Sequence, residues 1–258
     1  MTNVLYTVEN YTAFLTINRP ESLNCFNYET LEQLEEIVEE IRSNREVRTV
    51  IITGAGEKAF SAGADLKERK TLTEQQVKRN LYKIGEVFFK IEQLPQPVIA
   101  GINGYAFGGG MELALACDFR IMGDHAQIGL TETSLGIIPG AGGTQRLPRL
   151  IGEARAMELI LTARRLNAED ALKYGLVLEI VPGDQVLEVC KELAEAISKN
   201  GPVAVQQAKF AIKNGLNADL HTGLQIERKA YEITIPTEDR VEALQAFSEK
   251  RKPVFKGK

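Results

Sequence analysis

Residues 103–118 read NGYAFGGGMELALACD and join a predicted strand to a predicted helix. Three successive glycines, Gly108 to Gly110, open the helix, and Glu112 falls in its first turn. A helix N-terminus has unpaired amides and a partial positive charge, which suits an oxygen that becomes negative during a reaction. Glu112 is either a surface acid that complements the helix dipole or a functional group. The glycines favour function, because each costs on the order of 1 kcal/mol relative to alanine inside a helix and close approach of a ligand would compensate.

A second segment, KAFSAGADLKER at 58–69, follows a strand that ends at Gly54. Ala62, Gly63 and Ala64 are small enough for a ligand to come close to the backbone, where exposed amides donate to an anion. The alternative is an ordinary tight turn before a helix. This segment alone does not separate the two interpretations.

A third segment, GLTETSLGIIPGAGGTQRLPRLIG at 129–152, places Glu132 among apolar and small residues. Burial disfavours the charged form of a carboxyl group, so the pKa of Glu132 is expected to rise and to suit a general acid. The alternatives are an acid at a helix start, capped by Thr131 or Thr133, and a simple glycine-rich loop at 139–143. Taken together, the three segments supply backbone donors and two carboxyl groups at strand ends, where α/β sheets bind ligands. Such a set fits the addition of water to an activated alkene.

Strands and helices alternate on both sides of these segments. Apolar periodicity and breaker residues predict two strands in 4–17, a helix at 28–43, a strand at 47–54, a helix at 73–93, strands at 98–104, 119–123 and 127–130, and helices through 143–175 and 184–250 interrupted by VLEIV at 177–181. The alternating part predicts a parallel, layered α/β core. The helical part is either a cap or an oligomerisation element.

Composition excludes several classes of protein. The chain has 258 residues, enough for one large domain or a domain with an appendage, and its net charge of −4 argues against a nucleic-acid surface. The basic end EKRKPVFKGK at 249–258 is either solvated or a phosphate contact. No stretch approaches the roughly 18 apolar residues of a membrane span, and no signal peptide is expected, so we predict a cytoplasmic protein.

Metal and nucleophile motifs are missing from the sequence. The three cysteines show no CxxC spacing, which supports neither a zinc site nor a disulfide framework. Only two histidines occur, and there is no GxSxG, HExxH or P-loop motif. The proposed water addition requires neither a metal nor a redox cofactor.

The chain resembles the enoyl-CoA hydratase (crotonase) family from INRPESLNCFN at 17–27 to EKRKPVFKG at 249–257. The most specific motifs are AFSAGADLK, NGYAFGGGMELALACD and PGAGGTQRLPR. The resemblance implies an α/β fold, a crotonase-like spiral of ββα units with a C-terminal α-helical trimerisation region. We therefore expect residues 1–195 to form the spiral core and 196–258 the helical oligomerisation region, in a homotrimer or a hexamer of two stacked trimers.

The resemblance also implies roles for individual residues. The oxyanion donors fall on the amides of Ala64 and Gly109, the catalytic acids on Glu112 and Glu132, and the amide that helps to hold water on Gly140. Glu112 is the expected general base and Glu132 the expected proton donor. The positions matching the coenzyme A contacts are Ala62, Ala64, Asp65, Leu66 and Lys67. No separate cofactor is implied, because coenzyme A is part of the substrate.

Both acids together favour a hydratase, since isomerases, dehalogenases and decarboxylases of this fold often lack one of them. The implied reaction is reversible addition of water across the 2,3 double bond of a trans-2-enoyl-CoA, in fatty-acid metabolism. Alternatives are a methylglutaconyl-CoA hydratase, an enoyl-CoA isomerase, or an RNA-binding or non-catalytic scaffold. RNA binding in similar proteins involves a lysine-rich early helix, whereas LEQLEEIVEEIRS at 31–43 is acidic here. We expect the acyl pocket wall to come from the helix at 73–93 and from residues near 133–140.

Overall fold

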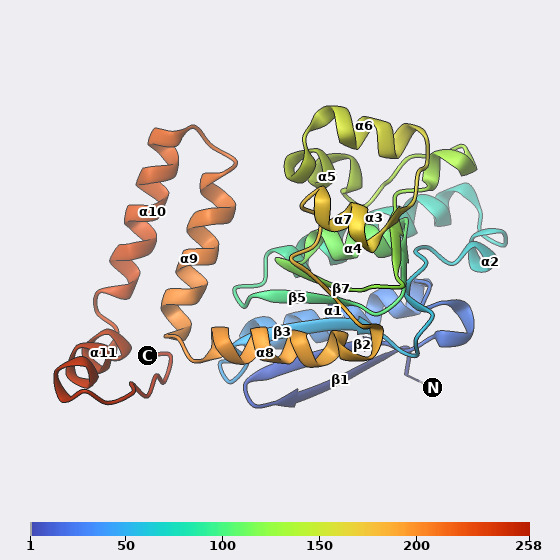
Figure 1. Ribbon diagram of the computed structural model, residues 1–258. Helices are drawn as coiled ribbons and strands as arrows, with labels where there is room; N and C mark the ends of the chain where they lie inside the picture. Colours follow the sequence, from blue (N-terminus) through green and yellow to red (C-terminus); the bar gives the residue numbers. More distant parts are fainter. Residues whose placement is uncertain (1) are drawn as a thin grey trace.

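The computed structural model describes residues 2–258 and contains two sheets (Figure 1). The larger sheet has the order β1-β2-β3-β5-β7-β10. Its strands are β1 (Val4–Glu9), β2 (Thr12–Ile17), β3 (Thr49–Gly54), β5 (Val98–Ile102), β7 (Phe119–Gly123) and β10 (Glu179–Val181). β1 and β2 form an antiparallel hairpin through Asn10 and Tyr11, both at positive φ as a two-residue turn of this kind requires. All other neighbours in this sheet are parallel, as the strand–helix alternation predicted.

The smaller sheet has the order β4-β6-β8-β9 and was only partly predicted. Its strands are β4 (Ala59–Ser61), β6 (Tyr105–Phe107), β8 (Gln127–Gly129) and β9 (Leu166–Asn167). β4, β6 and β8 each follow a strand of the larger sheet and precede helical chain, which gives the repeating ββα unit that the resemblance implies. β9 interrupts the stretch 143–175 that was predicted as helical, because it pairs with β8 and Asn167 then caps the next helix through the Asp170 amide.

Helices cover both sheets and enclose the core. They are α1 (Tyr28–Ser43), α2 (Leu66–Arg69), α3 (Glu74–Glu92), α4 (Gly109–Ala116), α5 (Gly143–Ile151), α6 (Glu153–Leu161), α7 (Ala168–Lys173) and α8 (Val186–Ser198), with short 3-10 turns at η1 (Pro20–Ser22), η2 (Glu132–Leu135) and η3 (Gly183–Gln185). α1 begins where Asn27 accepts a hydrogen bond from the Thr30 amide at 2.9 Å. Every residue of α4 is buried, which explains its nearly uniform apolar sequence. α4, which carries Glu112, is therefore held in place by packing on all sides.

The last three helices stand apart from the sheets (Figure 1). They are α9 (Pro202–Gly215), α10 (Leu220–Thr234) and α11 (Glu238–Glu249), and α9 packs along α10. They expose large apolar side chains, including Phe210, Ile212, Leu216, Leu220, Tyr231, Leu244 and Phe247. The predicted boundary at 195/196 falls within α8, whose buried residues pack on β3, β5 and β7. The oligomerising role of 196–258 stays a prediction.

No helix in residues 2–258 is both long and apolar enough to cross a membrane.

Candidate active site

A cavity of about 750 Å³ lies where α2, α3 and the start of α4 face the segment 131–141. Residues of all three glycine-containing segments, 58–69, 103–118 and 129–152, line it. The residues that line it are Phe26, Leu31, Ala62, Ala64, Asp65, Leu66, Glu68, Arg69, Leu72, Val77, Asn80, Leu81, Ile84, Gly108, Gly109, Glu112, Thr131, Glu132, Leu135, Ile137, Ile138, Pro139, Gly140 and Ala141. Residues of the helix at 73–93 and of the stretch 133–140 thus line the cavity, and their role as the wall of the acyl pocket stays a prediction.

Two residues that line this cavity have backbone amides without an acceptor. Neither the Ala64 nor the Gly109 amide donates a hydrogen bond within residues 2–258. The peptide groups beside Ala64 are held by Phe26, whose amide donates to the Gly63 oxygen at 2.8 Å and whose oxygen accepts from Asp65 at 2.9 Å. Gly63 has φ +91°, and a methyl group there would lie 2.8 Å from the Gly109 nitrogen. Glycine at 63 is therefore required for the two loops to approach each other.

Glu112 lies on α4 with only 3% of its surface exposed. Its Oε1 accepts hydrogen bonds from the amides of Ala141 at 2.7 Å and Gly143 at 2.8 Å. Burial raises the pKa of Glu112, while these two amides and the charge of Arg146 oppose the rise. No donor in residues 2–258 reaches Oε2, so this oxygen is left for a ligand in the cavity.

Glu132 lies at the start of η2 and is 9% exposed. Burial raises its pKa to about 7, and the charge of nearby Glu112 contributes to the rise. Its Oε2 is buried without a hydrogen-bond partner among the described residues. Gly108, at φ +51°, leaves room for this carboxyl group, because a methyl group there would lie 3.2 Å from Glu132 Oε1. A buried carboxyl group without donors keeps its proton to a higher pH than an exposed one.

Gly140 lines the cavity and packs against α3. A methyl group at Gly140 would lie 2.4 Å from Leu81 Cδ1, so α3 and the 139–143 loop touch at this point. The structure thus brings Ala64, Gly109, Glu112, Glu132 and Gly140 to one cavity, as the sequence predicted.

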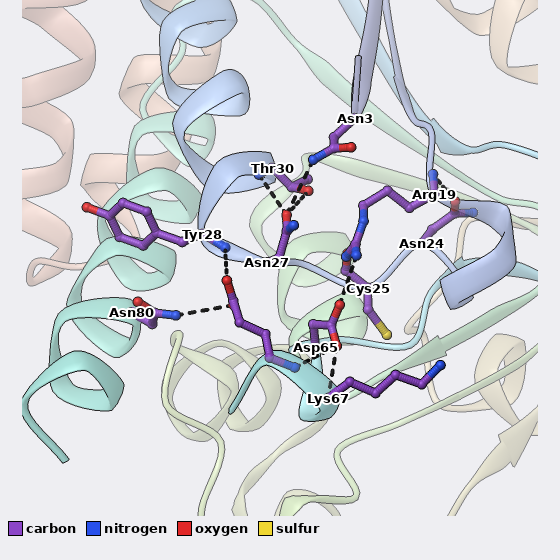
Figure 2. A network of polar contacts seen from close by, with 11 residues as sticks. Asn3, Arg19, Asn24, Cys25, Asn27, Tyr28, Thr30, Asp65, Lys67 and Asn80 are labelled. Atoms are coloured by element: carbon purple, nitrogen blue, oxygen red, sulfur yellow. Dashed lines mark hydrogen bonds and ion pairs between the residues drawn. The ribbon is translucent and has the colours of Figure 1, made fainter. Parts of the chain in front are cut away.

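The residues predicted to contact coenzyme A divide into two groups. Ala62, Ala64, Asp65 and Leu66 line the cavity, whereas Lys67 is exposed and does not. Figure 2 shows that Asp65 belongs to a polar network between the loop after β2 and the start of α2. Arg19 Nη2 contacts Asp65 Oδ2 at 2.9 Å, and Asp65 Oδ1 accepts from the amides of Lys67 and Glu68. Although burial acts to raise the pKa of Asp65, these donors hold it below its usual range.

This network positions Asp65 and Glu68, which line the cavity, and the sequence did not predict it. Arg19 Nη1 also donates to the Cys25 oxygen at 2.6 Å (Figure 2). Arg19 therefore links the chain before α1 to Asp65, which follows Ala64. Glu68 Oε1 accepts from the Tyr28 amide at 3.2 Å. The carboxylate of Asp65 therefore shapes the loop and caps α2.

A second missed group supports Glu112. Arg146 on α5 binds Glu92 through Nε at 3.1 Å and Nη2 at 2.7 Å, and its Nη1 donates to the Ala141 oxygen at 2.8 Å. Arg146 thereby fixes the loop whose amides hold Glu112. Nothing in the segment GGTQRLPR indicates that Arg146 reaches a residue 54 positions away.

No group of three or more His, Cys, Asp or Glu side chains in residues 2–258 is arranged to hold a metal ion.

Comparison with known proteins shows the family of the chain. Residues 7–258 match the family described as Enoyl-CoA hydratase/isomerase. The chain belongs to the enoyl-CoA hydratase/isomerase family. It is 56% identical over 256 residues to YngF of Bacillus subtilis (strain 168), covering 99% of this chain and 98% of that protein. It is 46% identical over 247 residues to the mitochondrial methylglutaconyl-CoA hydratase of Homo sapiens, covering 94% of this chain and 73% of that protein.

Solved structures of the enoyl-CoA hydratase/isomerase family share the whole fold. The crystal structure of enoyl-CoA hydratase from Bacillus anthracis has a TM-score of 0.98 and 54% identity, covering 99% of this chain and 100% of that one. The expected α/β crotonase fold is confirmed, and the chain is an enzyme of the hydratase/isomerase type.

Proposed function

We propose that this enzyme is an enoyl-CoA hydratase, which adds water reversibly and in syn fashion across the 2,3 double bond of a trans-2-enoyl-CoA to give a 3-hydroxyacyl-CoA. One observation carries the proposal: two buried carboxyl groups and two unbonded amides share a single cavity. An isomerase needs only one group that moves a proton between carbons. Hydration needs a second group as well, and the second carboxyl group can activate the water.

The amides of Ala64 and Gly109 bind the thioester oxygen and stabilise the enolate that forms when water attacks C3. Glu112 accepts a proton from that water through Oε2, while Oε1 stays bound to two amides. Glu132, with its raised pKa, gives its proton to C2, and the enolate collapses to the thioester. The Gly140 amide helps to hold the water. Proton exchange with solvent then returns both acids to their starting forms.

Coenzyme A enters as part of the substrate, with Ala62, Ala64, Asp65, Leu66 and Lys67 at its binding side, and no separate cofactor or metal takes part. The exposed apolar side chains of α9 to α11 support assembly as a homotrimer or a hexamer. The cytoplasmic location stays a prediction from the sequence.

The test is the loss of enoyl absorbance from crotonyl-CoA when the enzyme is added. Glu132→Gln removes the transferable proton and should lower kcat about 100- to 10 000-fold. Glu188→Gln on the exposed face of α8 is the matched control and should leave the rate unchanged. Hydration by Glu132→Gln at the rate of the unaltered enzyme would overturn the proposed site.

Isomerisation is the second candidate, because the matching family includes isomerases by name. Mass spectrometry separates the two reactions, since hydration adds one water to the product and isomerisation adds nothing. A product of unchanged mass would replace the hydratase proposal by the isomerase.

A further inference from the structure

Thr133 belongs to the short turn η2 and does not line the cavity, yet it is bonded to another element. Its Oγ1 donates a hydrogen bond at 2.6 Å to the oxygen of Ile160, in the last turn of α6. The other hydrogen bonds that the residues of η2 make within the described chain all stay inside the segment 131–137. The Thr133 hydroxyl is therefore the one hydrogen-bond link in residues 2–258 from η2 to a separate element.

This link matters because little else holds Glu132 in place. Glu112 is fixed by the amides of Ala141 and Gly143, whereas the carboxyl group of Glu132 receives a hydrogen bond from no other residue in 2–258. Packing and the backbone of η2 must therefore place it. η2 has only four residues, and a 3-10 turn of that length has poor hydrogen-bond geometry and little stability of its own.

The geometry of η2 directs its side chains to different sides. A 3-10 helix has three residues per turn, so Glu132 and Leu135 lie on the same side. Both of them line the cavity. Thr133 comes a third of a turn after Glu132 and meets α6 instead. One short turn thus presents its acid to the cavity and its hydroxyl to a helix end.

The end of α6 is a well-ordered acceptor for this hydroxyl. It has the hydrogen bonds of a Schellman motif, in which the amide of Ala163, at φ +52°, donates to the Ile160 oxygen at 3.3 Å. The Arg164 amide donates to the Leu159 oxygen at 3.1 Å. The chain then enters β9, which pairs with β8, the strand that leads to η2. A methyl group at Gly129 on β8 would lie 3.0 Å from the Arg164 oxygen, so the two segments are in contact.

We infer that Thr133 is a positioning residue, whose hydroxyl docks η2 on the end of α6 and so keeps the Glu132 carboxyl group buried and in place to give its proton to C2. This inference rests on the proposed hydratase function. Without the hydroxyl, η2 would be free to move away from α6. Glu132 would then be displaced from the reacting carbon and would reach solvent more often.

The test is Thr133→Val, which keeps the shape of the side chain and removes the hydroxyl. The Ile160 oxygen keeps the Ala163 amide as a donor, so the variant should fold. Because misplacement of a catalytic group is costly, kcat for crotonyl-CoA hydration at pH 8 should fall about 10-fold with KM nearly unchanged. Thr133→Ser restores the hydroxyl and should recover most of the rate. Thr162→Val is the matched control, because Thr162 Oγ1 donates to the Glu158 oxygen at 2.6 Å at the same end of α6.

The pH profile is a readout that a general loss of stability would not move. Thr133→Val changes no charge, and the charged groups at the end of α6, Glu158 and Arg164, pair with each other at 3.2 Å. Burial and the charge of Glu112 raise the pKa of Glu132. Greater exposure removes part of the effect of burial, so the alkaline fall of kcat should begin at lower pH in Thr133→Val. Thr133→Ser should keep the original profile.

The outcomes separate this inference from the hydratase proposal. An unchanged kcat and pH profile in Thr133→Val, an equal loss in Thr162→Val, or a change confined to KM would each overturn the inference. Urea unfolding at pH 8 tests it without a substrate, because Glu132→Gln removes a buried carboxylate and should stabilise the fold. That gain should be smaller in the Thr133→Val background, and an equal gain would overturn the inference.

Failure of the hydratase proposal would have a different signature. In that case the unaltered enzyme hydrates no enoyl-CoA, whatever residue stands at 133. A smaller gain from Glu132→Gln in the Thr133→Val background would still support Thr133 as the residue that keeps Glu132 buried.

Discussion

The two carboxyl groups of the cavity lie in opposite environments. Glu112 receives two backbone hydrogen bonds from the 141–143 loop, whereas Glu132 keeps one oxygen buried with no donor. Donors stabilise a carboxylate and burial without donors stabilises the acid, so the same residue type is prepared for two roles. The surrounding backbone decides which acid acts as base and which as proton donor.

The largest expected effect comes from removing the base. Glu112→Gln keeps an oxygen for the Ala141 and Gly143 amides but no longer accepts a proton, so kcat for crotonyl-CoA hydration should fall about 100- to 10 000-fold. Steady-state kinetics measure the loss, and thermal unfolding shows that the fold is intact. A fall of less than threefold would mean that Glu112 is only structural.

The pH dependence should follow the other acid. Glu132 must be protonated to donate, and its pKa is raised to about 7, so kcat for hydration should be highest below pH 7, down to the pH at which the base Glu112, whose pKa is also raised, takes up a proton. Above pH 7 it should fall by about tenfold per pH unit. Initial rates from pH 5.5 to 9 give the profile. The small residual rate of Glu132→Gln should show no such fall, and a fall that persists would assign the titration to another group.

The support of Glu112 should matter less than Glu112 itself. Arg146→Met releases the Ala141 oxygen and the Glu92 ion pair, so the loop amides should hold Glu112 less rigidly. We expect kcat to fall about 10-fold with KM nearly unchanged. Arg149→Met on the exposed side of α5 is the control. Equal changes of kcat in both variants would show that Arg146 does not support Glu112.

The smallest expected effect is on the free energy of unfolding, and it is a gain rather than a loss. Because the folded-state pKa of Glu132 is raised, ionising it opposes folding; the cost is absent below about pH 4.5, grows up to about pH 7 and is then constant. Glu132→Gln should therefore stabilise the protein by about 1–3 kcal/mol at pH 8. At pH 4 it should have little effect. Urea unfolding at both pH values tests this, and an equal shift at both would refute the buried-charge explanation.

Sequence reasoning located the two acids and the long elements because their signals are local. Glu112 follows a glycine run at a helix start, and α1 and α3 show several turns of apolar periodicity. β4, β6 and β9 have two or three residues each, too few for a periodic pattern to emerge. The contacts of Arg19 with Asp65 and of Arg146 with Glu92 join distant positions. Only the folded chain reveals them.

The link between the C-terminal helices and the core limits how the molecule can move. Lys209 on α9 contacts Asp118 Oδ2 at 2.6 Å, and the same oxygen accepts from the Val98 amide where β5 begins. Both ionic side chains are only 10% exposed, and breaking a buried pair of this kind costs about 3–5 kcal/mol. Asp118 follows α4 by two residues. This ion pair therefore fixes the position of α9 relative to the core. A second subunit that bound these helices would be held in a fixed orientation relative to α4, which carries Glu112.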